Sequence, residues 1–288
     1  MTSSSAVRVA ISQLSRTQTV YDGFMLDDPS RKIDYDDQHG DQAETHCSAE
    51  QNVLNESCHD RTRALLSDRA IEILTEKSVL VAGLGGVGSW AAEALARAGI
   101  GRLILIDGDV IAPSNLNRQL FALESTVGQS KCHVARRRLL DINGSLIVET
   151  MDKPLVTGEI DGVLQRFAPI DYIVDAIDSL TAKIDLIATA LSHNVPVISS
   201  MGTGNRLDPT RLKIADLSET HTDPLARIVR RELRKRGFEH LKVVFSEEPP
   251  VKSFGVDKGT IGSVPFVPPV AGFLLASEVI RDLIGAPA

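Results

Sequence analysis

The sequence is poor in cysteine, in aromatic residues and in long apolar runs. Its 288 residues include three cysteines, too few for a disulfide framework, so we expect a protein of a reducing compartment. Aromatic residues make up 4%, which argues against binding single-stranded nucleic acid by base stacking. The longest apolar run, from Val264 to Ala276, contains three prolines and is too short to span a bilayer as a helix. No signal-peptide pattern is visible.

An excess of positive charge is also lacking. The chain has 31 Lys and Arg against 38 Asp and Glu, and a net charge of -7 by itself argues against a nucleic-acid partner. The acidity is concentrated in residues 1–58, which hold 10 acidic and 4 basic residues and lack a sustained apolar period. We therefore predict a disordered acidic extension over residues 1–58 and a near-neutral folded domain over residues 59–288.

The amino-terminal residues leave the location of the protein open. Residues 2–20 are rich in Ser and Thr, contain Arg8 and Arg16 and have no acidic residue. This composition fits an organellar transit peptide and also an arbitrary disordered leader, and we favour the leader and a cytoplasmic protein. The pairs His46-Cys47 and Cys58-His59 match the spacing of no common zinc site, so we expect no metal there.

Short apolar runs alternate with helical segments from Arg61 onward. This alternation predicts an α/β fold with a mostly parallel sheet flanked by helices, followed by an α+β extension after residue 205. The expected strands are 78–82, 103–106, 146–148, 172–174, 195–198, 212–217 and 241–245. The expected helices are 64–77, 87–98, 131–142, 159–167, 181–192, 222–236 and 270–284.

A glycine-rich loop connects the first expected strand to the next helix. It contains Gly83, Gly85, Gly86 and Gly88, and the helix that follows offers free N–H groups to a phosphate. Asp107 ends the next strand, where a carboxylate accepts hydrogen bonds from a ribose. The loop therefore predicts an adenine-nucleotide site. It leaves open an NAD-dependent oxidoreductase and an ATP-using enzyme.

The residues after Asp107 favour ATP. A nicotinamide site needs no further cations, whereas a triphosphate does, and Arg118 and Lys131 are of the right type to hold phosphates. Asp178 follows another strand at the edge where ligands of open α/β sheets bind, and a carboxylate there suits Mg²⁺.

Together these motifs resemble the ubiquitin-activating-enzyme-like superfamily and its bacterial sulfur-carrier adenylating relatives. The shared pattern comprises the GxGGxG loop, Asp107-Gly108-Asp109, Ser114-Asn115-x-x-Arg118-Gln119, Lys131 and Asp175-x-x-Asp178-Ser179, and it covers residues 61–200. The resemblance implies a Rossmann-like fold and a homodimer in which an amino-terminal Arg, here Arg61 with Arg63 as the alternative, reaches the partner's ATP.

The same resemblance implies the roles of individual residues. Arg118, Lys131 and Asp178 are the expected catalytic groups, with Asp178 on Mg²⁺. The expected ATP-binding residues are Gly83, Gly85, Gly86, Gly88, Asp107, Asp109, Ser114, Asn115, Arg118, Lys131, Ser179 and Arg61.

The carboxyl-terminal third of the sequence narrows the resemblance from the superfamily to one family within it. No cysteine follows Cys132, so the zinc-binding CxxC pairs common in activators of ubiquitin-like proteins are missing. The segments 201–210, 216–225, 227–237 and 243–246 resemble the tRNA threonylcarbamoyladenosine dehydratase family. The resemblance implies an ATP-dependent ligase that cyclises threonylcarbamoyladenosine in tRNA through carboxylate adenylation, releasing AMP and pyrophosphate. A sulfur-relay partner is left open, and an activator of a ubiquitin-like sulfur carrier is the alternative function.

One basic segment is compatible with the tRNA substrate. Residues 225–242 hold 7 basic and 2 acidic residues, which predicts either a solvated helix face or a contact with the tRNA backbone, and the resemblance favours tRNA. Cys132 is expected to be a buried structural thiol. His221 either faces the substrate or belongs to a capping turn. The expected tRNA-binding residues are Arg227, Arg230, Arg231, Arg234, Lys235 and Arg236.

Overall fold

The computed structural model describes residues 57–252 and 261–285. Of the disordered extension predicted over residues 1–58, residues 1–56 lie outside the described residues, and so do the leader over residues 2–20 and the His46-Cys47 pair. Within them, no group of three or more His, Cys, Asp or Glu side chains could hold a metal ion. No helix in these two ranges is long and apolar enough to cross a membrane.

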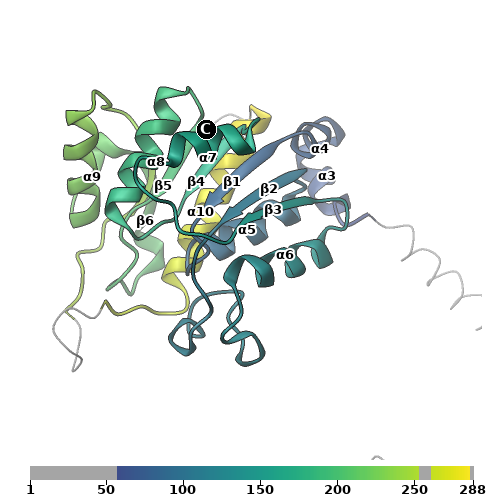
Figure 1. Cartoon of the computed structure of the whole chain (residues 1–288), viewed down its shortest axis with the longest axis horizontal. Coiled ribbons are helices and arrows are strands. Elements are labelled where there is room, and N and C mark those ends of the chain that lie inside the picture. The colour runs from purple at the N-terminus through teal and green to yellow at the C-terminus, as the bar shows by residue number, and fades with distance from the viewer. Residues whose placement is uncertain (1–56, 253–260, 286–288) are drawn as a thin grey trace, which may run out of the picture. The chain divides into compact units, whose positions relative to one another are not determined.

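The fold is built on one seven-stranded sheet in the order β3-β2-β1-β4-β5-β7-β6 (Figure 1). All neighbouring strands are parallel except β6 and β7, which pair antiparallel. The predicted α/β architecture with a mostly parallel sheet is therefore confirmed. The strands are β1 (Ser78–Ala82), β2 (Arg102–Ile106), β3 (Ile147–Met151), β4 (Tyr172–Asp175), β5 (Val197–Ser200), β6 (Leu212–Asp216) and β7 (Lys242–Ser246).

Helices cover both faces of the sheet because its central strands carry apolar side chains on both sides. Val79 and Val81 of β1 pack into one core with α4, α5, α6 and α10, whereas Leu80 and Ala82 pack into the other with α7, α8 and α9. The helices are α3 (Asp60–Leu66), α4 (Asp68–Thr75), α5 (Gly88–Ala98), α6 (Lys131–Ile142), α7 (Ile160–Phe167), α8 (Leu180–Ser192), α9 (Pro224–Lys235) and α10 (Val267–Ile284).

Several predicted boundaries were wrong by two or three residues, as at the end of β3 and the start of α10, and two further differences have a clear local cause. The single helix expected over residues 64–77 is divided at Ser67, whose φ of 79° interrupts the helix and whose side chain accepts a hydrogen bond from the Ala70 N–H. The strand expected over residues 195–198 starts two residues later, as β5. Pro196 has no N–H for a sheet ladder and contributes only its carbonyl, which accepts from the Ile173 N–H.

The carboxyl ends of the parallel strands place several loops at one edge. The glycine-rich loop follows β1, Asp107 follows β2, the turn with Asp178 follows β4, and the segment 201–206 follows β5. Since β1 lies between β2 and β4, and β4 lies beside β5, these loops are neighbours along the edge.

Candidate functional site

Two glycines let the glycine-rich loop pack tightly against the turn after β4. Gly83 has a φ of +87°, and a Cβ there would lie 2.6 Å from the Ala176 carbonyl oxygen. At Gly88 a Cβ would lie 1.8 Å from the Gly83 carbonyl oxygen, so any side chain would separate α5 from β1. Gly83 and Gly88 therefore bring loop, helix and turn together.

The backbone N–H donors at the end of this loop are free. In the described part of the chain, the N–H groups of residues 85–88 have no hydrogen-bond acceptor. They lie at the amino-terminal end of α5, where the helix dipole is positive. Open space surrounds Gly85, since the nearest atom to a Cβ there is the Gln119 side-chain nitrogen at 3.9 Å. This arrangement suits a phosphate.

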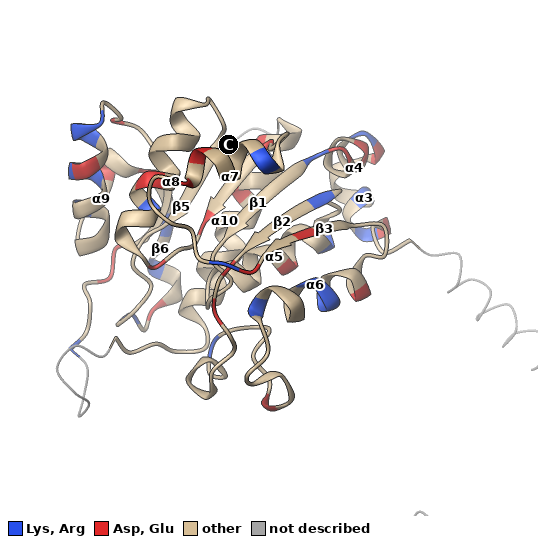
Figure 2. Cartoon of the chain, in the orientation of Figure 1, with Lys and Arg blue, Asp and Glu red and all other residues tan. Residues whose placement is uncertain are grey.

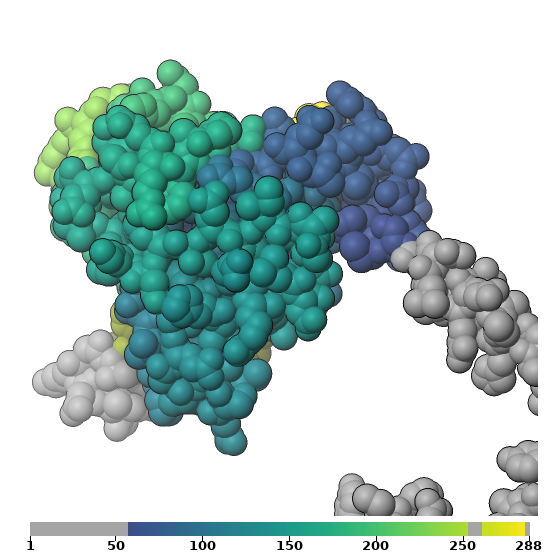
Figure 3. Space-filling model, turned by 45° about the vertical axis from the view of Figure 1, so that its right-hand side comes forward, coloured from purple at the N-terminus to yellow at the C-terminus, as the bar shows by residue number. Residues whose placement is uncertain are grey.

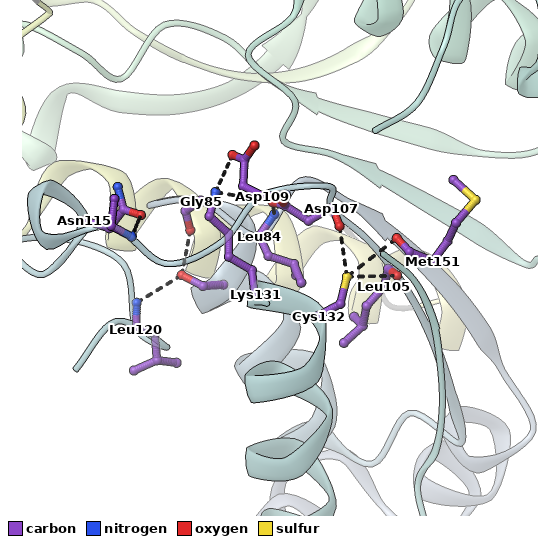
Figure 4. Close-up of polar contacts among 12 residues, drawn as sticks. Leu84, Gly85, Leu105, Asp107, Asp109, Asn115, Leu120, Lys131, Cys132 and Met151 are labelled. Atoms are coloured by element: carbon purple, nitrogen blue, oxygen red, sulfur yellow. Dashed lines mark hydrogen bonds and ion pairs between the residues drawn. The ribbon is translucent and has the colours of Figure 1, made fainter. Parts of the chain in front are cut away.

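The Asp107 carboxylate holds two backbone segments together. One oxygen accepts from the Leu84 N–H at 2.7 Å, and the other accepts from the Asp109 N–H at 2.8 Å (Figure 4). The side chain is 8% exposed, so the carboxylate lies in the wall of the site directly beside the glycine-rich loop. The predicted ribose contact of Asp107 is compatible with this position.

Lys131 lies between two carboxylates at the start of α6. Its Nζ is 2.7 Å from the Asp109 carboxylate and 3.7 Å from the Asp107 carboxylate (Figure 4). The Lys131 side chain is only 7% exposed, whereas that of Asp109 is 73% exposed. A nearly buried ammonium group beside free loop amides forms a favourable environment for a polyanion, and a bound phosphate would compete with the exposed Asp109 for it.

Arg118 lies across the glycine-rich loop. A Cβ on Gly86 would approach the Arg118 Cγ and Cδ to 3.2 and 3.3 Å, so a glycine at this position makes room for the arginine. The guanidinium donates to the Ser114 carbonyl and to the Asn117 side chain, both at 2.9 Å. Asn115 shapes the same loop, because its side-chain oxygen accepts from the Ala112 N–H at 3.0 Å.

The turn after β4 presents Asp178 to solvent. Asp178 and Ser179 are both exposed, and no hydrogen bond or ion pair occupies the Asp178 carboxylate among the described residues. The turn contacts the glycine-rich loop through Ala176, whose N–H donates to the Ala82 carbonyl at 2.8 Å. A free carboxylate beside a phosphate site fits Mg²⁺, which commonly takes one protein carboxylate and completes its shell with phosphate and water.

Two residues that sequence reasoning missed, Lys183 and Ser199, lie beneath this turn together with Asp175, a motif residue to which no role was assigned. Asp175, Lys183 and Ser199 are buried and joined by hydrogen bonds. The available signal was Lys183 itself, a single lysine in the otherwise mostly apolar helix α8. A charge among apolar residues at helical spacing indicates a buried partner.

The structure does not bring Arg61 to this site within one chain. Arg61 is exposed in α3, and the preceding His59 packs against Gly99, before β2, at the amino-terminal edge of the sheet. In Figures 1 and 3, α3 and α4 lie at one end of the folded unit, away from the loops of residues 107–130. Arg63 is paired with Asp60 and Asp68, each at 2.7 Å. The predicted contact of Arg61 with ATP is therefore not made within one chain.

The predicted basic helix is present as α9, but its arginines differ in exposure and in hydrogen bonding. Arg230 is half-buried, and its guanidinium donates to the carbonyls of Leu217 and Thr220 and to the Thr220 hydroxyl, at 3.0, 2.8 and 2.6 Å. By contrast, Arg227 and Arg234 are exposed and have no ionic partner in the described part of the chain. Figure 2 shows the Lys and Arg positions of α9 in blue. Arg230 is therefore committed to the fold, whereas Arg227 and Arg234 are available.

The remaining basic residues of this helix are exposed and paired. Arg231 and Lys235 share the Glu232 carboxylate, at 2.9 and 3.0 Å, and Arg236 lies 3.4 Å from Asp185. Such exposed pairs are weak, so these cations remain accessible to a stronger anionic partner.

The cysteine beside Lys131 is no nucleophile. Cys132 is fully buried, and its Sγ lies 3.3 Å from the Asp107 carbonyl oxygen (Figure 4). Burial raises the pKa of the Cys132 thiol to about 12, so the thiolate is absent at neutral pH.

The carboxyl-terminal motifs meet in a buried polar cluster. Asp223 caps α9 by accepting from the N–H groups of Leu225 and Ala226, and it also accepts from the Gly202 N–H. Arg206 is 1% exposed and lies 3.9 Å from Asp223. The cluster attaches the segment after β5 to the start of α9. His221, at 55% exposed, lies beside this cap, and the capping role belongs to Asp223.

Comparisons with known proteins agree with this geometry. The model of the ThiF family matches residues 59–288. The tRNA threonylcarbamoyladenosine dehydratase of Bacillus subtilis is 42% identical over 241 residues, which cover 78% of this chain and 93% of that protein. The molybdopterin-synthase adenylyltransferase of Escherichia coli is 35% identical over 128 residues, 44% of this chain and 50% of that protein.

A solved structure has the same fold. The crystal structure of Escherichia coli tRNA N6-threonylcarbamoyladenosine dehydratase in complex with ATP matches with a TM-score of 0.72 and 33% identity, covering 78% of this chain and 92% of that one.

Proposed function

Because the chain belongs to the ThiF family and, within it, to the tRNA threonylcarbamoyladenosine dehydratases, we propose that it cyclises threonylcarbamoyladenosine in tRNA at the expense of ATP. The observation that carries the proposal is the match to the Bacillus subtilis relative over 93% of its length, which extends beyond the nucleotide-binding half. The free loop amides, Lys131 and Arg118 supply the site that this chemistry needs.

The glycine-rich loop and its two cations bind the triphosphate. The N–H groups of residues 85–88 receive phosphate oxygens, and Lys131 and Arg118 neutralise their charge from two sides. Asp107 receives the ribose hydroxyls. Gly86, with the Arg118 side chain against it, brings backbone and guanidinium to the same phosphate.

Asp178 would hold Mg²⁺ with the phosphates, and Ser179 lies next to it at the start of α8. When bound, the ion neutralises charge on the pyrophosphate that leaves. Its ligand here is an exposed carboxylate, which suits a metal that arrives with the nucleotide and keeps most of its water.

The reaction proceeds by activation of a carboxylate. The threonine carboxylate of the modified base attacks the α-phosphate of ATP, the bond to the β-phosphate breaks, and pyrophosphate leaves. A nitrogen or oxygen of the same base then attacks the acyl carbon, loses its proton and expels AMP, so the base loses one water. Both nucleophiles belong to the substrate, so no protein nucleophile is needed, in agreement with the buried Cys132. Lys131 and Arg118 stabilise charge as it develops on the phosphate.

The α+β part after residue 205 faces the tRNA. The exposed cations of α9 provide a positive surface for phosphates of the RNA backbone, with Arg227 and Arg234 the least engaged. We assign residues 59–288 as the ATP-binding domain and, within it, residues 205–288 as the tRNA-facing part.

The complete enzyme is proposed to be a homodimer, because α3, which carries Arg61, lies away from the loops of its own nucleotide site and the predicted role of Arg61 then requires a partner chain. A sulfur-relay protein is a further proposed partner on the strength of the family alone. A cytoplasmic location is proposed, with an organelle as the alternative.

Mass spectrometry of the modified nucleoside tests the function. The purified protein, ATP, Mg²⁺ and tRNA carrying threonylcarbamoyladenosine are expected to yield a nucleoside lighter by one water, together with AMP and pyrophosphate. A folded protein that binds ATP yet leaves the nucleoside mass unchanged would contradict the proposal.

The alternative is an activator of a ubiquitin-like sulfur carrier, which the 35% identity to the molybdopterin-synthase adenylyltransferase favours. That similarity is confined to 44% of this chain, and the zinc-binding CxxC pairs are missing from the sequence. Pyrophosphate exchange that depends on a carrier ending in Gly-Gly would favour this alternative.

A further inference from the structure

A buried ion pair lies under the turn that carries Asp178. Lys183 of α8 and Asp175 at the end of β4 are 1% and 0% exposed, and the Lys183 Nζ lies 2.7 Å from an Asp175 carboxylate oxygen. The pair lies at the carboxyl edge of the sheet, yet it is too deep to contact a ligand. Its influence on the site has to pass through its neighbours.

The Lys183 ammonium connects the ends of two adjacent strands. Besides Asp175 of β4, it donates to the Ser200 carbonyl at 3.1 Å and lies 3.3 Å from the Ser199 hydroxyl, both on β5. The Ser199 hydroxyl in turn donates to the Asp175 carboxylate at 2.5 Å. One buried charge thus fixes β4, β5 and the first turn of α8 relative to one another.

On the β4 side, this network shapes the turn before Asp178. The second Asp175 oxygen accepts from the Ile177 N–H at 3.1 Å, which bends the chain directly after the strand. Ala176, between them, donates to the Ala82 carbonyl and packs against Gly83. The direction in which Asp178 leaves the sheet therefore depends on the orientation of the Asp175 carboxylate.

On the β5 side, the network holds the start of the segment 201–206. Ser200 is the last residue of β5, and two residues later the Gly202 N–H donates to Asp223, the cap of α9. The ammonium is therefore the shared anchor of the turn with Asp178 and of the segment that leads to the tRNA-facing part.

Stability alone does not account for such a pair. A buried ion pair loses much of its attraction to desolvation, and apolar residues of similar volume often replace it without loss of stability. What apolar residues cannot replace is directional bonding to a carboxylate, a hydroxyl and a carbonyl at once.

We propose that Lys183 is a positioning residue for the adenylation step, acting through Asp175. It orients the turn that carries Asp178 towards the Mg²⁺–nucleotide complex and keeps the neighbouring segment 201–206 in register with it. The inference rests on the proposed function for the identity of the reaction, but its effect on nucleotide binding requires no tRNA.

The test compares nucleotide affinity with and without Mg²⁺ by calorimetry in the full-length protein. The double variant Asp175→Asn/Lys183→Met removes both buried charges and keeps an acceptor for the Ile177 N–H. We expect the metal-free ATP affinity to stay within about twofold, while the gain in affinity on adding Mg²⁺ and the kcat fall about 10- to 100-fold, as for outer-shell partners of metal ligands.

The matched control is Lys77→Met. Lys77 pairs with Asp171 at 3.0 Å and, through it, with the amino-terminal ends of β1 and β4, at the opposite edge of the sheet. This variant is expected to lower the melting temperature and to leave the effect of Mg²⁺ unchanged. Equal losses in Lys77→Met and in the double variant would show that only stability is involved and would overturn the proposal.

A milder variant serves if the double variant fails to fold. Ser199→Ala removes one hydrogen bond to Asp175 without altering the charge. We expect faster amide hydrogen exchange at Ile177 and a reduced effect of Mg²⁺ on ATP affinity. Unchanged exchange and an unchanged Mg²⁺ effect would overturn the positioning role. If wild-type protein binds Mg²⁺ and ATP but fails to cyclise tRNA, the proposed function fails while these measurements still decide the role of Lys183.

Discussion

The chemistry proposed for this protein depends on the position of a single ammonium group. Lys131 is nearly buried between two carboxylates, and the exposed one, Asp109, is the partner that a phosphate would displace. A charge held in this way is preorganised, so little reorganisation is needed when ATP binds.

Replacing Lys131 with methionine tests this role. We expect kcat for cyclisation to fall about 100- to 1,000-fold, because one electrostatic stabiliser of the transition state is removed. The control is Lys153→Met, which removes an exposed lysine near Gly108. Steady-state kinetics of AMP release measures both, and a Lys131→Met enzyme with more than a tenth of wild-type kcat would contradict the assignment.

For Cys132, the buried residue next to Lys131, we expect the opposite result: its replacement should affect stability at high pH but not activity. Burial raises the pKa of Cys132 from 9.0 to about 12, so its thiol group stays neutral while the unfolded thiol ionises. This contribution to stability is complete below pH 9 and is lost as the pH rises towards 12. Cys132→Ala is therefore expected to remain active and to show a shallower loss of unfolding free energy above pH 9 than the wild type. Denaturant titrations at a series of pH values measure this, and an inactive Cys132→Ala enzyme would contradict it.

At the scale of the secondary-structure elements, the glycine-rich loop combines two kinds of glycine. Gly88 is required by packing, because a Cβ there would overlap the Gly83 carbonyl. Gly85 has open space around it and faces the proposed phosphate site. The two glycines are equivalent in the sequence motif, but in the structure Gly88 is required by packing and Gly85 leaves space beside the loop.

Alanine at each position distinguishes these roles. Gly88→Ala is expected to lower the free energy of unfolding by at least about 1–3 kcal/mol, as overpacking does. Gly85→Ala is expected to leave stability within about 0.5 kcal/mol, as for a change without contacts. It should nevertheless weaken ATP binding, since a methyl group would occupy the phosphate site. Thermal unfolding and ATP calorimetry on both variants test this, and a destabilised Gly85→Ala would contradict it.

In helix α9, Arg230 stabilises the fold, whereas the exposed arginines Arg227 and Arg234 are expected to contact tRNA. Arg227→Gln/Arg234→Gln is expected to reduce the salt dependence of tRNA binding by about two phosphate contacts, one for each cation removed. The control Arg230→Gln should instead destabilise the fold by about 1–3 kcal/mol, because the carbonyls of Leu217 and Thr220 lose their donor. Titrations of tRNA at several salt concentrations measure the slopes. An unchanged slope in the double variant would exclude Arg227 and Arg234 from the tRNA contact.

At the scale of the whole molecule, the residues predicted to bind ATP lie at two opposite edges of the sheet. The loops at the carboxyl edge come from one chain, while Arg61 lies at the other edge. The proposed homodimer with shared sites would reconcile these positions, and mixing experiments detect such sharing.

Two inactive variants are expected to complement each other. In a mixture of Arg61→Ala and Lys131→Met subunits, each mixed dimer has one site with both defects and one with neither. Random assembly should therefore restore about a quarter of wild-type activity, since half of the dimers are mixed and each has one intact site. Activity no higher than that of the separate variants would show that Arg61 does not act in the partner's site.

The sequence alone was sufficient to predict the class of fold, because the apolar strands and the glycine pattern are local signals. It also supplied the nucleotide site that we propose, since the glycine-rich loop and Asp178 follow predicted strands, Lys131 starts a predicted helix, and parallel strands end at a common edge. The observed boundaries differ from the predicted ones at Ser67, whose positive φ divides a helix, and at Pro196, which has no N–H for the sheet.

Which charged residues take part in the fold itself, in contrast, depends on tertiary packing. Arg230 lies in the same basic run as Arg227, yet its position on the helix turns it towards the carbonyls before α9. Lys183 and Asp175 form a pair only because α8 packs on β4 beside β5, and nothing in the spacing of residues indicates Ser199 as their third member. Burial and partner distances depend on elements far apart in the chain, so a local pattern cannot specify them.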